Sequence, residues 1–298
     1  MDLGIGKENC ILVPTDFSDT CRNALLHAVE ISKVSMCKIY LLHIIGETNF
    51  PTILNNDLVD NHKYLEENNP LKHIGEKLQQ LINECKIDTI KPFIRKGDFF
   101  VTINDVIEEV NADLMIVGTH GKVGIQKIFG SNVIKIIDNT DIPVIVVQDY
   151  SVPKIYKKIV FPIKVKSGDR QKTHFTGLLA LATQSEIHIF PFFGKSGTDF
   201  RKVFNEVIQV YNYFNKYGIE RKIVENLRDD DDFNKQILDY SVSENADLIV
   251  IISNADKHHI ISGAPEESLL FNKSYIPVLC LNRKKVRHSA AGGLVTGN

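Results

Sequence analysis

The sequence predicts an α/β protein built from two successive units, each a parallel sheet covered by helices on both faces. Two observations support this prediction. Short apolar runs alternate with longer segments of helical periodicity along the chain, a pattern typical of parallel strands joined by helices. Several short motifs also occur twice at constant offsets. The chain is therefore interpreted as a duplication.

In the first unit, the predicted strands are apolar runs at Cys10–Thr15, Lys38–Ile45, Asp88–Arg95, Asp113–Val117 and Pro143–Gln148. The predicted helices lie between them, at Asp19–Val34, Pro70–Cys85, Phe99–Val110 and Asn132–Asp138. Ser18 is a suitable N-cap for the first helix, because its hydroxyl can accept a hydrogen bond from a free backbone N–H. Pro70 suits the first turn of the second helix. The asparagine-rich stretch Gly46–Asn69 is predicted to be a loop or irregular excursion.

The second unit follows a short linker, Asp149–Ile155. Ile159–Pro162 repeats Ile11–Pro14 at an offset of 148 residues, whereas Asn245–Leu248 repeats Asn111–Leu114 at an offset of 134. The second unit thus lacks 14 residues where the first has its excursion. We predict domains at residues 1–149 and 156–285, followed by a flexible tail at 286–298.

Composition and charge limit the classes of function. The 298 residues are 43% hydrophobic and 24% charged, as in ordinary globular domains, and the net charge of −2 argues against a broad nucleic-acid-binding surface. The five cysteines are scattered, with no CxxC pair, which favours reduced thiols. No apolar run is long enough to cross a bilayer, and the N-terminus has no apolar signal segment. We therefore expect a soluble, cytoplasmic protein without a membrane partner.

A glycine-rich segment, Gly118–Ser131, directly follows the predicted strand Asp113–Val117. Glycines let backbone N–H groups approach an anion, and Gly130–Ser131 is predicted to open a helix whose first N–H groups are unpaired. The segment can therefore be a phosphate cradle, or a connection that needs glycine only for its turns. It is not a Walker A motif, because Ser131 rather than a lysine follows Gly130, and its glycine spacing does not fit the dinucleotide fingerprint.

The second unit provides an internal comparison for these glycines. Gly118, Gly121 and Gly130 align with Ile252, Ala255 and Ala264, and Ser131 aligns with Pro265. If the fold alone required the glycines, the second unit would need them too. The comparison favours a phosphate site in the first unit.

With these motifs in view, the chain resembles the universal stress protein family in its tandem form. The resemblance is carried by Val13–Ser18, Leu41–Ile44 and Asp113–Ser131, the last being similar to the family's nucleotide signature G-x2-G-x9-G-[S/T]. Here eight residues rather than nine separate Gly121 from Gly130. The resemblance implies a doubly wound, Rossmann-like sheet of strand order 3-2-1-4-5, with the ligand beyond the carboxyl ends of the first and fourth strands.

The resemblance also implies the residues of a site for ATP or another adenine nucleotide, with Mg2+ as a possible companion. Asp16 would accept hydrogen bonds from the adenosine, the Ile44 backbone would contact the adenine, and Gly121, Gly130 and Ser131 would hold the phosphates. The full set of candidate residues is Pro14, Thr15, Asp16, Ile44, Gly118, His120, Gly121, Lys122, Gly130, Ser131 and Asn132. The alternative for Asp16 is a carboxylate that only stabilises the start of the following helix.

The second unit is expected not to bind nucleotide in this manner, because Lys164 aligns with Asp16 and Pro265 has no N–H to donate. The two units are expected to pack as a pseudo-dimer through Pro143–Gln148 and Pro277–Leu281, and two chains as a homodimer, with unidentified protein partners. His258 and His259, with Asp256 nearby, suggest a metal site, but adjacent histidines on a loop rarely both bind a metal without a third partner, so no metal site is predicted.

The other polar residues have simpler interpretations. His43 is expected to be a core or strand-edge residue, Asp229–Asp232 a solvated loop leading into a helix, and His120 a weak candidate for contact with phosphate or a cation. No nucleophile with a base and an orienting group is evident. We therefore predict a nucleotide-binding stress-response regulator that acts through conformation or partner contacts. The alternatives are a slow ATPase and a nucleotide-free scaffold or sensor of small molecules.

Overall fold

The structure is a computed structural model of the 298-residue chain. It describes residues 9–46, 70–119, 128–164, 169–193, 197–225, 232–253 and 265–282. The predicted excursion at 47–69, His258, His259 and the predicted tail at 286–298 lie outside these ranges.

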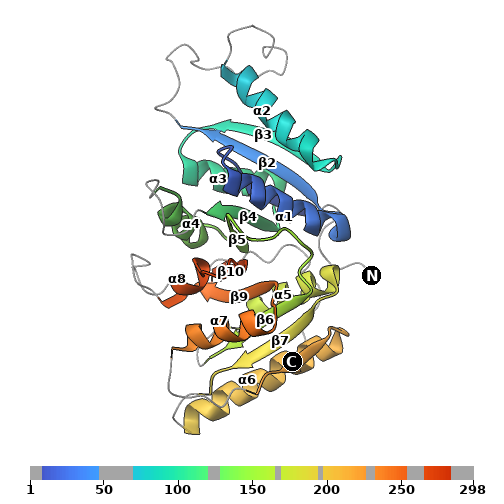
Figure 1. The fold of residues 1–298 in the computed structure, drawn as a ribbon, viewed down its shortest axis with the longest axis vertical. Coiled ribbons are helices and arrows are strands. Elements are labelled where there is room, and N and C mark those ends of the chain that lie inside the picture. The colour runs from blue at the N-terminus through green and yellow to red at the C-terminus, as the bar shows by residue number, and fades with distance from the viewer. Residues whose placement is uncertain are drawn as a thin grey trace.

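The described strands form one ten-stranded sheet in the order β3-β2-β1-β4-β5-β10-β9-β6-β7-β8. Within each half all strand pairs are parallel, and the two halves meet where β5 and β10 pair antiparallel, with Val146 opposite Val278. Figure 1 shows this arrangement as an elongated molecule, with α2 at one end, α6 at the other and β5 and β10 in the middle. The predicted α/β class and the 3-2-1-4-5 strand order are confirmed.

The first half contains five strands: β1 Cys10–Pro14, β2 Lys38–Ile45, β3 Ile90–Lys96, β4 Leu114–Thr119 and β5 Val144–Gln148. Its helices are α1 Asp19–Ser35, α2 Pro70–Cys85, α3 Phe99–Val110 and α4 Ile128–Asn139. The predicted N-cap is confirmed, since the Ser18 side chain accepts from the Cys21 N–H. One boundary was wrong: α4 begins at Ile128, so Gly130 and Ser131 lie inside its first turns rather than before it. A glycine inside a helix lowers the stability of the helix by only about 1 kcal/mol relative to alanine, so a glycine does not have to mark a helix boundary.

The second half repeats this topology. Its strands are β6 Lys158–Ile163, β7 Glu186–Pro191, β8 Arg221–Ile223, β9 Leu248–Ser253 and β10 Val278–Asn282. Its helices are α5 Asp169–Thr183, α6 Gly197–Lys216, α7 Phe233–Ser243 and α8 Pro265–Leu270. Asp232, at the end of the predicted acidic loop, is the N-cap of α7 and accepts from the Asn234 N–H.

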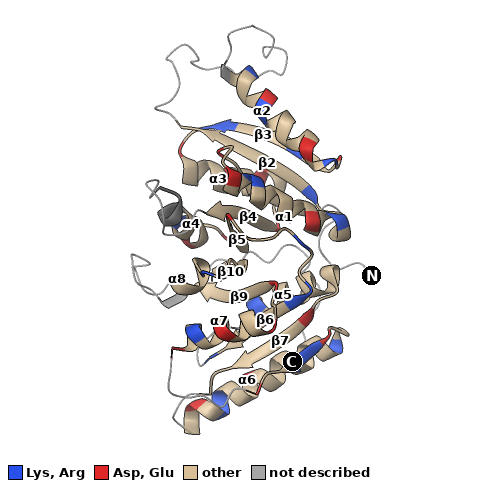
Figure 2. Cartoon of the chain, viewed as in Figure 1, with Lys and Arg blue, Asp and Glu red and all other residues tan. Residues whose placement is uncertain are grey.

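Helices cover both faces of the sheet because the buried strands present apolar side chains to each side alternately. Ile11 and Val13 belong to the cluster that contains residues of α1, α2, α5 and α6, whereas Leu12 belongs to the cluster with α3, α4, α7 and α8. None of the five cysteines, all of which the structure describes, is in a disulfide, and four of them are buried. No helix of the described residues is long and apolar enough to cross a membrane. Figure 2 shows acidic and basic residues interspersed over both halves.

The repeated Asn-Ala-Asp-Leu motif has a structural explanation. Asn111 and Asn245 both adopt left-handed backbone conformations, with φ of 49° and 53°, where the chain leaves a helix, and asparagine tolerates this region better than most residues. In each half, the aspartate two residues further on connects the start of the fourth strand to the start of the first strand by hydrogen bonds. Asp113 accepts from the Cys10 N–H at 3.0 Å, and Asp247 accepts from the Lys157 and Lys158 N–H groups, each at 2.8 Å.

The segment predicted as a short linker is firmly packed against α1. The Asn23 side-chain amide donates to the carbonyls of Gln148 and Ser151, both at 2.8 Å. The Tyr156 hydroxyl lies 3.0 Å from His27 Nδ1, and both side chains are fully buried. Burial lowers the pKa of His27 to about 4, helped by the charge of Lys154, against a hydrogen bond at Ser151 that raises it. The imidazole is therefore neutral near pH 7.

Candidate functional site

The carboxyl edge of β1, β2 and β4 gathers the first group of candidate residues. β1 lies between β2 and β4, with Pro14 opposite Leu42 and Leu12 opposite Met115. Pro14 ends β1, Ile44 lies near the end of β2, and Gly118 is the last but one residue of β4. The chain leaves β1 towards β2 on one side and reaches β4 on the other, so this edge is the switch point of the sheet, where ligands of open α/β sheets bind.

The turn from β1 into α1 is held by its own side chains. Asp16 Oδ1 accepts from the Ser18 N–H at 2.9 Å, and Thr15 Oγ1 accepts from the Phe17 N–H at 3.0 Å. Phe17 has a positive φ of 69°, which is costly for a bulky residue. The two side-chain hydrogen bonds stabilise that conformation.

Asp16 is exposed at this turn. Desolvation by itself would raise the pKa of Asp16, but hydrogen bonds from Ser18 and Cys21 outweigh it and hold the pKa below its ordinary value. The carboxylate is therefore ionised near pH 7 and can only accept hydrogen bonds. One oxygen is used by the backbone of the turn, so the helix-start interpretation of Asp16 describes part of what the residue does.

His43 supports the same turn, a role that the sequence did not indicate. Its Nδ1 lies 2.8 Å from the Thr15 carbonyl oxygen, and its ring centroid is 4.6 Å from that of Phe17. Burial lowers the pKa of His43, so the neutral ring donates to Thr15. The signal that could have revealed this contact is the position of His43 one residue beyond Leu42, which pairs with Pro14 at the end of β1.

Gly118 is required by packing. A Cβ atom built on it would lie 2.3 Å from the Thr20 carbonyl oxygen and 2.9 Å from the Cys21 nitrogen, both in the first turn of α1. The absence of a side chain lets α1 lie directly against the end of β4. Ile252 occupies the aligned position in the second half. In the first half, the close approach of α1 to β4 is a packing reason for a glycine at position 118.

The phosphate part of the predicted site is described only through the backbone of α4. Gly130 lies within α4, whose described part begins at Ile128. His120, Gly121 and Lys122 lie outside the described residues, and the side chains of Ser131 and Asn132 are also outside the description.

The corresponding edge of the second half is chemically different. Lys164 follows β6 where Asp16 follows β1. The Lys172 side chain is buried, donates to the Pro162 carbonyl near the end of β6, and lies 4.1 Å from the Phe161 ring centroid. Pro265 begins α8, the helix equivalent to α4. A cation thus stands where the first half has a carboxylate acceptor.

The two halves contact each other reciprocally near these edges. The Gln148 side-chain amide donates to the Asn272 carbonyl at 2.9 Å, and the Asn282 amide donates to the Asp138 carbonyl at 3.0 Å. Gln148 and Asn282 are the last residues of β5 and β10, and Asp138 lies near the end of α4. The helix that begins at the first site therefore ends against the second half.

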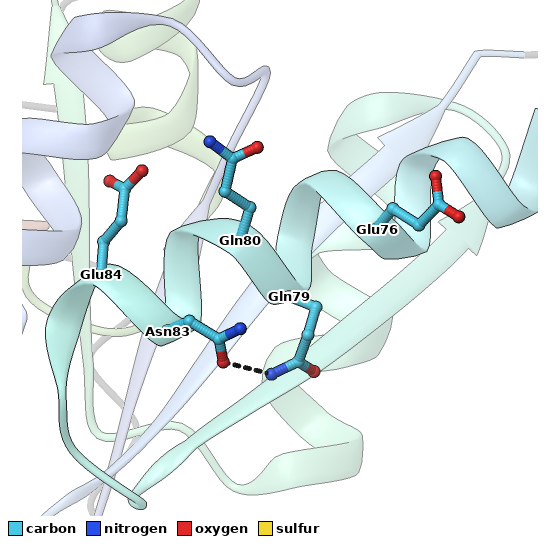
Figure 3. Close-up of a pocket in the computed structure, with 5 residues that line it drawn as sticks. All are labelled: Glu76, Gln79, Gln80, Asn83 and Glu84. Carbon is cyan, nitrogen blue, oxygen red and sulfur yellow. Dashed lines mark hydrogen bonds between the residues drawn. The ribbon is translucent and has the colours of Figure 1, made fainter.

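A separate surface hollow does not coincide with this edge. It is lined by residues of α2 alone: Glu76, Gln79, Gln80, Asn83 and Glu84. In Figure 3, Gln79 and Asn83 are joined by a hydrogen bond of 2.9 Å on one side of the helix, while Gln80 and Glu84 point to the other. One polar helix surface offers no convergent set of groups. No cluster of three potential metal ligands occurs among the described residues.

Comparison with known proteins agrees with this geometry. The sequence profile of the universal stress protein family matches residues 9–148. Two universal stress proteins of Methanocaldococcus jannaschii are 29% and 28% identical over 145 and 152 residues, which is 46% of this chain in each case and 81% and 93% of theirs. The crystal structure of a universal stress protein from Archaeoglobus fulgidus superimposes with a TM-score of 0.69 at 20% identity, covering 93% of this chain and 99% of that one.

The edge formed by β1, β4 and α4 is thus the switch-point edge of a doubly wound α/β domain. Residues 9–148 are thus similar to the universal stress protein family, and the chain matches these curated relatives over about half of its own length. The likeness to the Archaeoglobus fulgidus protein extends over both halves and shows the fold.

Proposed function

We propose that the first half binds ATP or a related adenine nucleotide, with Mg2+ on its phosphates, at the carboxyl edge of β1 and β4. One observation supports this most. Asp16 and Gly118 belong to two segments that carry the family resemblance and are 102 residues apart, yet they lie at the same edge of the sheet, at the ends of the neighbouring strands β1 and β4. Asp16 supplies an ionised acceptor for ribose or adenine groups. The first turn of α4 supplies N–H donors and a positive dipole end for phosphate.

We propose further that the second half does not bind nucleotide in this manner and instead receives a signal from the first. The lack of nucleotide binding in the second half is supported by the residues at its equivalent edge, namely Lys164, Lys172 and Pro265. The transfer of a signal is supported by α4, because its Asp138 carboxylate accepts a hydrogen bond from Ser253, at the end of β9, at 3.2 Å. A ligand that moves the start of α4 would change this contact. The output would then be regulatory, through conformation or contact with partners, including a second copy of the chain.

The test of nucleotide binding uses Asp16→Asn. Asparagine retains the side-chain oxygen that accepts from the Ser18 N–H, so the turn persists while the charge is lost. With millimolar ATP and Mg2+, a ligand that binds only the folded state stabilises the parent by about 2.7 kcal/mol at a hundredfold excess over Kd. We expect this shift in the parent and a much smaller one in Asp16→Asn.

The matched control is Asp98→Ala, which removes the N-cap carboxylate of α3. Asp98 accepts from the Phe100 and Val101 N–H groups, each at 3.0 Å, and lies at a different helix start. It should lower the intrinsic stability but keep the full ATP shift. A parent that does not respond to ATP would sink the proposal and favour a nucleotide-free scaffold. Sedimentation with and without ATP would show whether binding changes the association of two chains.

A further inference from the structure

The described sheet has two outer strands, β3 and β8, and only one of them is protected against the addition of a further strand. The Ile39 N–H of β2 donates to the Thr89 carbonyl at 2.9 Å, so the odd-numbered residues beside and within β3 face β2. Pro92 therefore belongs to the even-numbered set whose backbone points outward, and it has no N–H to donate. A proline at this position hinders the pairing of β3 with another strand.

The outer side of β8 has no such protection. The Val224 N–H donates to the Ile189 carbonyl of β7 at 2.8 Å, so the even-numbered residues of this segment face β7. The backbone N–H and C=O groups of Arg221, Ile223 and Glu225 therefore point away from the sheet. Among the described residues these groups have no backbone hydrogen-bond partner. This outer side can accept another strand.

The odd-numbered side chains of β8 lie on the α6 side of the sheet. Ile223 is opposite Ile189, which belongs to the same apolar cluster as Val203 of α6. The guanidinium carbon of Arg221 lies 4.5 Å from the ring centroid of Tyr211, also on α6. Ile223 itself remains 41% exposed. One side of α6 and the outer side of β8 thus form a single surface at the end of the molecule (Figure 1).

α6 presents a row of exposed apolar side chains on this surface. Phe200, Phe204 and Ile208 are 46%, 47% and 38% exposed, and the rings of the two phenylalanines are stacked with centroids 6.1 Å apart. Their spacing of four residues places them on the same side of the helix, and Tyr211 continues the row three residues further on. Exposed apolar side chains gathered in this way mark an interaction surface.

The equivalent helix of the first half shows that the fold does not require this row. Buried residues of α2 and α6 match at an offset of 132 residues, as Leu78 matches Val210. At that offset, polar residues of α2 take the places of Phe204, Ile208 and Tyr211, namely Lys72, Glu76 and Gln79. The apolar row is therefore a property of α6 and not of this helix position in the fold.

The order of charges along β8 indicates a second copy of the chain as the partner. When β8 pairs antiparallel with its own copy around Ile223, Arg221 lies directly opposite the partner's Glu225 on the same face of the sheet. The twofold symmetry repeats this pair of opposite charges. A pairing centred on Lys222 would instead place two lysines opposite each other, which is unfavourable. The charges thus select one register.

We propose that two chains associate by antiparallel pairing of β8 with its copy, centred on Ile223, and by packing of the two exposed α6 rows against each other. α6 covers β7 and β8, so the two α6 helices come two strand spacings apart, roughly 9–10 Å, which is a packing distance of helices. The chain joins its own halves in the same way, since β5 and β10 pair antiparallel while α1 and α5 are in contact. This association does not depend on nucleotide binding.

The experiment measures the dimer Kd of the full-length chain by sedimentation without nucleotide. Ile223→Lys places two ammonium groups opposite each other at the centre of the joint. Glu225→Arg places an arginine opposite the partner's Arg221, and the double variant Arg221→Glu/Glu225→Arg restores opposite charges. Glu76→Arg is the matched control, because it makes the same charge change at an exposed position of α2. Thermal unfolding of dilute protein verifies that each variant folds.

We expect the parent to be a dimer with twice the 33.7 kDa mass of one chain. Ile223→Lys and Glu225→Arg should each raise the dimer Kd about tenfold or more, the double variant should restore it in part, and Glu76→Arg should leave it unchanged. In the parent, hydrogen exchange at the Arg221, Ile223 and Glu225 amides should slow as the protein concentration rises.

A parent that sediments as a monomer up to its solubility limit would overturn the inference, and the surface would then be free for a different protein. A dimer whose Kd is the same in the parent, Ile223→Lys and Glu225→Arg would also overturn it, by placing the contact elsewhere. Hydrogen exchange in the parent decides the matter without any substitution, because amides of β8 that exchange equally fast in monomer and dimer would contradict the pairing.

Discussion

Replacement of Gly118 by alanine tests the packing of α1 against β4 with one methyl group. The added Cβ would lie 2.3 Å from the Thr20 carbonyl oxygen and 2.5 Å from the Thr20 carbonyl carbon. Both are backbone atoms, so no side-chain rotation relieves the contact. An ordinary contact distance requires the first turn of α1 to move by about 1 Å, and overpacking of this kind costs roughly 1–3 kcal/mol or somewhat more.

We therefore expect Gly118→Ala to lower the free energy of unfolding by about 3 kcal/mol and the midpoint temperature by roughly 5–10 °C. The chain has no tryptophan, so unfolding is followed by circular dichroism at 222 nm in urea and in a thermal scan. The displaced first turn of α1 directly follows Asp16 and its N-cap Ser18, so ATP binding should weaken in parallel.

The control for Gly118→Ala is Gly75→Ala in α2. A Cβ at Gly75 meets nothing within 4 Å, and alanine inside a helix is favoured over glycine by roughly 0.5–1 kcal/mol. The two substitutions add the same methyl group and should change stability in opposite directions. A Gly118→Ala protein that unfolds within about 0.5 kcal/mol of the parent would refute the close approach of α1 to β4.

Two further predictions concern the buried His27 and the aspartates that precede the fourth strand of each half. The depressed pKa of His27, about 4, means that the unfolded chain binds a proton more readily between about pH 6.5 and pH 4. Stability should therefore be fully present above about pH 6.5 and fall by about 3 kcal/mol as the pH drops towards 4. His27→Gln should flatten that part of the stability–pH curve. An equal slope in the parent and in His27→Gln would contradict the assignment of this pH dependence to His27. Asp247→Ala should lower the free energy of unfolding by about 2–4 kcal/mol, because two backbone N–H groups lose their acceptor. Asp113→Ala removes one such bond and should lower it less. Urea titration of both variants measures the two losses, and a larger loss in Asp113→Ala would contradict the explanation.

The reciprocal contacts between the halves give the second half a structural role that does not depend on its own ligand. Asn272 and Tyr275 of the second half bind the end of β5 and the segment after it, since the Ser151 hydroxyl donates to the Tyr275 carbonyl at 2.7 Å. Equivalently, the Asp138 carbonyl of the first half accepts a hydrogen bond from the Asn282 amide, at the end of β10 in the second half. Each half therefore completes the packing of the other, and neither edge of the β5–β10 joint is left open.

Most elements could be predicted from the sequence, since each depends on local pattern. Continuous apolar runs such as Ile11–Val13 specify buried strands, Ser18 specifies a helix start, and the repeated motifs specify a second unit of the same topology. These signals act within a few residues, so they are readable without the fold. The position of α4 was misjudged because a glycine inside a helix and a glycine before one look alike when packing is unknown.

The sequence by itself determined the fold class and the repeated order of strands and helices in the two halves. Only the tertiary structure decided why Gly118 has no side chain, since its neighbours Thr20 and Cys21 are about a hundred residues away in the chain. It also distinguished Thr119 from Ser253, two hydroxyls at equivalent positions of which one has a protein partner. Steric exclusion and hydrogen-bond pairing depend on which atoms approach each other in space, and sequence pattern does not encode those distances.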